Sequence, residues 1–159
     1  MDNKYVKLHS ILRMLGALLA IIVFISMFIT KMVIHVDQKL FGNVFYDFSS
    51  GAFFGGDLCK GNVLGFFAYL FVLLGGLAGL AFVFIDELIG KDLTKKLAFV
   101  AGGLALVGGL LILLFAPIFI GINDFQDLTT AAGPIVFGIL GLVVGGINVA
   151  APILEDKGM

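Results

Sequence analysis

Charged residues and histidines divide this chain into four long runs that contain neither. The runs cover residues 14–30, 61–85, 97–123 and 128–154. A transmembrane helix needs about 20 apolar residues to cross roughly 30 Å of hydrocarbon, and only the first run is shorter. Met32, Val33 and Ile34 extend it, and Arg13 and Lys31 are expected to raise their charged ends to the interface. The pattern predicts one membrane domain over 1–159 with four spans, over about 10–34, 62–89, 94–121 and 130–154.

The composition excludes several classes of protein. Of 159 residues, 60% are hydrophobic and 13% charged, and the mean hydropathy is +1.14. Soluble domains carry about 25% charged residues, so we expect an integral membrane protein. The net charge of −1 gives no basic surface for a phosphate backbone, and nucleic acid is not expected as a partner. The single cysteine, Cys59, excludes an internal disulfide and a metal site built on paired thiolates.

Lysines and arginines near the span ends predict the orientation. Seven lie on one side, in the two tails and between the second and third spans: Lys4, Lys7, Arg13, Lys91, Lys95, Lys96 and Lys157. Three lie on the other side, in the first loop: Lys31, Lys39 and Lys60. Both termini are therefore predicted to be cytoplasmic, in the plasma (inner) membrane. The longest connection, over about 35–61, would then lie outside.

Small residues recur at helical spacing in three of the four spans. Lipid tails are as apolar as leucine, so membrane helices associate where small residues let their backbones approach. Spacing near 3.5 residues predicts left-handed, antiparallel packing. The expected helix-packing residues are Gly75, Gly79, Ala101, Ala105, Gly109, Gly138, Gly141, Gly145 and Asn148. The alternative is that glycine is simply common in membrane helices.

The first span lacks such a stripe, since Gly16, Ala17 and Ala20 are its only cluster of small residues. We therefore expect spans two to four to form a tight unit, with the first span packed more loosely or in contact with another subunit.

The first outer loop is rich in aromatic residues and poor in charge. It carries a predicted contact surface made of Phe41, Phe45, Tyr46, Phe48, Phe53 and Phe54. Gly42-Asn43 predicts a short β-hairpin between 33–41 and 44–48. Three ways to bury the aromatic rings stay open: against the membrane interface, over the mouth of the bundle, or against a neighbouring copy or partner. The predicted class is an all-α four-transmembrane-helix bundle with this hairpin as its β element.

Polar side chains inside the spans are few. Transporters, pumps and channels keep ionisable groups at membrane depth, and the four runs contain none. Asn148 lies on the glycine stripe of the fourth span, and we expect it to form an interhelical hydrogen bond rather than a substrate contact. His9 and His35 fall on opposite sides of the predicted bundle and cannot share a metal. No catalytic, metal or cofactor-binding residue is predicted.

The layout is similar to that of two known families. Four spans, both ends inside and a larger first outer loop resemble claudin-like tetraspan proteins. Claudins carry a Trp-Gly-Leu-Trp pattern and a cysteine pair in that loop, whereas this chain has no tryptophan and only Cys59. The chain also resembles the proteolipid subunit of rotary ATPases, but it lacks that family's carboxylate midway along a helix. We assign no family, and no functional residue is carried over.

These observations lead to a hypothesis of function. We expect a small non-enzymatic membrane protein that acts through protein–protein association, as a structural or accessory subunit. The expected partners are membrane lipid and either further copies of the chain or a larger membrane complex. The alternative is a passive carrier, pore or lipid-handling protein for an apolar or neutral solute, using a gap between the first span and the glycine-lined unit.

Overall fold

The computed structural model describes residues 7–35, 51–55, 59–124 and 128–157. Four of its helices are long and apolar enough to cross a membrane, as an integral membrane protein requires. A small antiparallel sheet of two strands is also present. In chain order the elements are α1 (Leu8–Ile29), β1 (Val33–His35), α2 (Gly51–Phe54), α3 (Val63–Ile89), α4 (Lys91–Leu113), α5 (Phe115–Asn123), β2 (Leu128–Thr130) and α6 (Ala132–Asp156).

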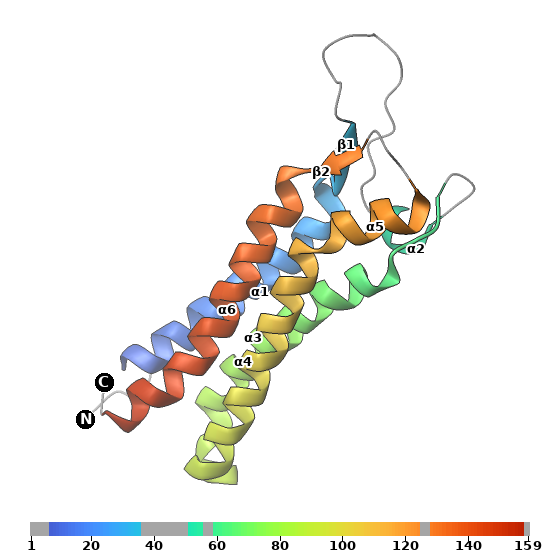
Figure 1. Ribbon diagram of the computed structural model, residues 1–159. Coiled ribbons are helices and arrows are strands. Elements are labelled where there is room, and N and C mark those ends of the chain that lie inside the picture. Colours follow the sequence, from blue (N-terminus) through green and yellow to red (C-terminus); the bar gives the residue numbers. More distant parts are fainter. Residues whose placement is uncertain (1–6, 36–50, 56–58, 125–127, 158–159) are drawn as a thin grey trace.

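The four long helices lie side by side in one elongated bundle (Figure 1). α1 packs against α3 and α6, and α4 packs against the same two helices from the opposite corner. The start of α1, the end of α6 and the turn between α3 and α4 lie at one end of the bundle, which we call the termini end (Figure 1). The two strands, α2 and α5 lie at the other end, which we call the cap end.

The turn between α3 and α4 consists of one residue, Gly90. Its φ of +85° is a conformation that residues with a Cβ rarely adopt, which explains glycine here. α4 therefore begins at Lys91, earlier than the expected start near 94, and α3 and α4 are antiparallel neighbours.

The third predicted span, over 94–121, is not one continuous helix. α4 ends at Leu113, and α5 turns away from the bundle axis (Figure 1). Pro117 explains the break, because it has no N–H to donate to the Leu113 carbonyl and its ring would clash with that oxygen. Leu114 still donates its N–H to Leu110 O at 3.0 Å, so the helical pattern fails only after it.

The sheet joins the two connections at the cap end, because β1 follows α1 and β2 precedes α6. Val33, Ile34 and His35 pair with Thr130, Thr129 and Leu128 respectively. The sequence predicted that the first strand would pair with 44–48, a segment that lies outside the described residues, so the hairpin stays a prediction. The fourth long helix begins after Ala131, whose side chain cannot cap it.

The first span buries as large a share of its apolar window as two of the others, but its contacts with α3 and α6 are less extensive than those that α4 makes with the same helices. The buried share of its apolar window is 39%, the same as in α4 and α6, against 44% in α3. The expectation that the first span packs more loosely than the other three therefore stays a prediction. Ala20 explains part of this contact, because its Cβ lies directly against Gly76 of α3.

Candidate functional site

The glycines of α4 and α6 lie where the two helices come closest. A Cβ built on Gly109 would lie 2.6 Å from Leu142 N and 2.9 Å from Gly138 O, which are backbone atoms of α6. Gly141 faces Gly109 from the other side, with its ideal Cβ 2.9 Å from Gly109 Cα. Backbone atoms cannot turn aside as a flexible side chain can, so this contact depends on the absence of side chains.

Other predicted small residues lie at neighbouring contacts. The ideal Cβ of Gly75 in α3 would lie 2.6 Å from Ala101 O and 2.8 Å from Ala105 Cβ in α4. Gly138 faces Leu113, and Gly145 faces Leu106, at 2.6 Å and 2.5 Å from the leucine Cγ atoms. Ala101 and Ala105 are buried. The predicted packing residues of α4 therefore face both α3 and α6.

Asn148 connects α6 to α3 through its amide group. Its Nδ2 donates to Gly75 O at 2.9 Å, in a buried position. Its Oδ1 lies against Gly79, where a Cβ would overlap it. Gly79 thus makes room for the amide, and the expected interhelical hydrogen bond has a backbone carbonyl as its acceptor.

The termini end contains a partly buried ion pair that sequence analysis missed. Arg13 Nη2 in α1 lies 3.2 Å from Glu155 Oε2 in α6, and the Arg13 side chain is only 2% exposed. Arg13 thus directs its charged end to a carboxylate of the bundle rather than to solvent, and its expected place at the membrane interface stays a prediction. The available signal was its position three, four and seven residues before Gly16, Ala17 and Ala20, on the same helix face.

The cap end contains an aromatic core. Phe53 of α2 is buried, with its ring centroid 5.1 Å from that of Phe115 and 5.9 Å from that of Tyr69. Tyr69 is buried too, and its hydroxyl donates to Met32 Sδ at 3.6 Å. Phe119 stacks on Phe115 at 6.0 Å. At Phe53 the loop therefore packs over the mouth of its own bundle.

The neighbouring Phe54 has the opposite environment, since 66% of its surface is exposed. Of the six aromatic residues predicted as a contact surface, only Phe53 and Phe54 can be placed. The others, Phe41, Phe45, Tyr46 and Phe48, lie outside the described residues.

Two asparagines hold the chain around α2 and α3 against α5. Asn123 accepts the N–H of Lys60 at 2.6 Å and donates to Lys60 O at 3.0 Å. Asn62 is buried and donates to Phe115 O at 3.3 Å. Sequence reasoning missed both, because nothing local marks an asparagine as the partner of a backbone group more than 50 residues away.

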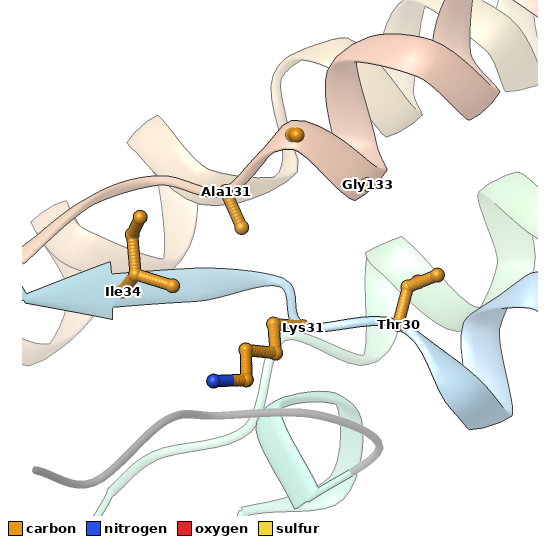
Figure 2. A pocket seen from close by; sticks show the side chains of 6 residues that line it. Thr30, Lys31, Ile34, Ala131 and Gly133 are labelled. Carbon is orange, nitrogen blue, oxygen red and sulfur yellow. The ribbon is translucent and has the colours of Figure 1, made fainter.

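A pocket of about 360 Å³ lies at the cap end, where α1 runs into β1 and α6 begins. Its lining is mostly small and apolar: Thr30, Lys31, Ile34, Ala131, Ala132 and Gly133. Figure 2 shows the Lys31 side chain directed away from Ala131 and Gly133. Lys31, the one cation of the lining, therefore does not point toward the start of α6, and the pocket does not form an anion-binding site.

Thiol and metal chemistry have little support in the described part of the chain. Its residues contain no group of three or more His, Cys, Asp or Glu side chains that could hold a metal ion. Cys59 is half-buried, and burial raises the pKa of its thiol, which lowers the thiolate fraction at neutral pH. No known protein family model matches the chain, and no curated protein matches it.

Proposed function

We propose that this chain is a structural or accessory membrane subunit that acts by association rather than by catalysis or charge transport. The observation that carries the proposal is a continuous row of exposed and half-buried aromatic rings on α2 and α3. We call it the aromatic row: Phe54, Phe66, Phe67 and Phe71. Ring centroids are 5.3 Å apart between Phe54 and Phe66, then 5.8 Å and 6.5 Å along α3.

The aromatic row is a surface that the fold leaves partly uncovered. Phe54 and Phe67 are 66% and 44% exposed, whereas Phe53 fills the core beside them. Phenylalanine presents a large apolar area and loses little rotamer freedom on contact, and rings in mutual contact are already oriented. Such a surface favours a protein partner over mobile lipid tails, and we propose a second copy of this chain or another helical membrane protein.

The polar groups of the bundle support the same proposal, because they are used inside the fold. Asn148 bonds to Gly75, and Arg13 pairs with Glu155. The alternative function, a passive route for an apolar or neutral solute, requires a gap beside the first span. Val23, Val72 and Val144 are fully buried at the centre of the bundle, which gives that alternative no support.

The proposal also includes the predicted left-handed packing, the plasma-membrane location and the cytoplasmic position of both termini. The termini end carries Lys91, Lys95 and Lys96, as the orientation rule requires of a cytoplasmic face. Labelling Cys59 in sealed right-side-out vesicles tests the orientation. A membrane-impermeant maleimide should reach Cys59 from outside, and labelling only after lysis would overturn it.

Particle mass in lipid discs tests association through the aromatic row. We expect the unaltered protein to form oligomers or to retain a co-purifying protein, and the double change Phe54→Ser with Phe67→Leu to release monomers. The matched control is Phe28→Leu on α1, because Phe28 is also exposed, at 57%, but lies outside the row. A strictly monomeric unaltered protein with no companion, or equal release by both variants, would refute the proposal.

A further inference from the structure

A second pocket lies at the termini end, between the start of α4 and the end of α6. Its volume is about 210 Å³, and it is lined by Lys91, Lys95, Pro152, Glu155 and Asp156. Four of these five side chains are ionisable. The start of α4 and the end of α6 both lie at the termini end of the bundle (Figure 1).

The pocket lining carries two lysines and two carboxylates, so its own formal charges sum to zero, but one of these carboxylates pairs with a cation outside the lining. Lys95 pairs with Asp156, and Glu155 pairs with Arg13 behind it. Lys91 forms no ion pair with any of the side chains that the structure describes, which do not include those of Asp86 and Glu87. Asp92 is in the same first turn of α4, but its exposed carboxylate does not line the pocket. After these pairings, one positive charge in the pocket is left without a partner among the described side chains.

Lys91 also stands at an unfavourable place on its own helix. The N-terminal turn of a helix carries a partial positive charge, so an ammonium group there is repelled rather than stabilised. An anion placed beside Lys91 would relieve that repulsion. A phosphate would also gain charge-assisted hydrogen bonds from the lysine.

Exposed apolar side chains flank the pocket on both helices. Leu88, just before the turn, is 83% exposed, and Leu93 of α4 and Ile153 of α6 are exposed as well. These side chains lie where a span meets the bilayer interface, so acyl chains would cover them. A ligand with a charged head and apolar tails matches this surface, whereas a free phosphate would use only the pocket.

We propose that this pocket binds the phosphodiester of a net-anionic phospholipid, with Lys91 as its principal contact. Basic pockets between membrane helices on the cytoplasmic side are recurrent sites for lipid head groups. The carboxylate oxygens of Glu155 and Asp156 can accept hydrogen bonds from the hydroxyls of a glycerol head group.

Native mass spectrometry of the full chain, released from micelles with added lipid, measures this binding. The probes are phosphatidylglycerol, phosphatidylcholine and inorganic phosphate. We expect phosphatidylglycerol to be retained most strongly. The change Lys91→Gln should weaken its retention about fivefold, the equivalent of about 1 kcal/mol for one lysine near an anionic lipid surface. Lys91→Arg keeps the charge and should keep the binding.

The matched control is Lys96→Gln. Lys96 is exposed on the same helix and carries the same charge, but it does not line the pocket. Circular dichroism and elution volume establish that each variant is folded. Equal retention of phosphatidylglycerol and phosphatidylcholine, equal losses in the two glutamine variants, or inorganic phosphate competing as well as the lipid would each overturn the proposal.

Discussion

Replacing Gly109 by alanine tests the backbone contact between α4 and α6. The added Cβ would lie 2.6 Å from Leu142 N, whereas ordinary contact of a Cβ begins at 3.4 Å. The helices would have to separate by about 0.8 Å, and a gap of that size forfeits between a quarter and a half of each van der Waals contact along the seam. Overpacking of this kind costs about 1–3 kcal/mol.

The matched control uses a glycine of the same helix that faces open space. An ideal Cβ on Gly103 has nothing within 4 Å. Gly103→Ala should therefore be neutral, or stabilise the helix by up to about 1 kcal/mol through its higher helix propensity. Combining the two effects, we expect the unfolding free energies of Gly109→Ala and Gly103→Ala to differ by about 1–4 kcal/mol.

Reversible unfolding in mixed micelles, followed by circular dichroism as the share of denaturing detergent rises, measures this difference. Gly146→Ala is a second control, on α6, because its Cβ would also meet nothing within 4 Å. If Gly109→Ala were as stable as Gly103→Ala, the close approach at Gly109 would not contribute to stability, and the reasoning would be refuted.

Three further predictions concern polar groups. Asn148→Ala should lower the unfolding free energy by about 0.6 kcal/mol, and at most about 1.7, because it removes one interhelical hydrogen bond. Glu155→Gln should lower it by about 1–3 kcal/mol, since the buried Arg13 loses a charged partner. Cys59 should react with maleimide more slowly at neutral pH than an exposed cysteine, and the rate should continue to rise at higher pH, because burial raises its pKa.

The same unfolding assay measures the first two, and a stopped-time labelling series measures the third. An unchanged midpoint for Asn148→Ala would mean that another group takes over Gly75 O. For the ion pair, the charge-preserving Glu155→Asp should lose less than Glu155→Gln, and equal losses would contradict a charge effect. For the thiol, the reference is a protein that carries Cys59→Ser together with Lys60→Cys, which moves the thiol by one position to an exposed side chain. Identical labelling curves for the unaltered protein and this reference would contradict the burial of Cys59.

Four helices long and apolar enough to cross a membrane could be predicted from the sequence. The reason is local, because a charge in hydrocarbon is costly wherever the rest of the chain lies, so each uncharged run can be recognised alone. The break at Leu114 carried a local signal too, in Pro117. Hydropathy did not reveal this break, because the residues of α5 are as apolar as those of a membrane span although they pack in the cap.

The candidate sites could be predicted less well from the sequence. Arg13 and Lys31 flank the same apolar run and received one interpretation, yet Arg13 is 2% exposed and paired whereas Lys31 is exposed. Their difference comes from Glu155, which lies 142 residues from Arg13 in the chain. No local pattern contains that information.

Phe53 and Phe54 make the same point with identical side chains. Composition predicted that this loop needs cover, because apolar surface is unfavourable in water whatever its position. Which ring enters the core and which one stays exposed depends on the direction of each Cβ and on the space left by Phe115 and Tyr69. The sequence by itself thus determined the helices and their polarity, whereas only the tertiary structure decided which surfaces meet, because packing depends on shapes that distant segments bring together.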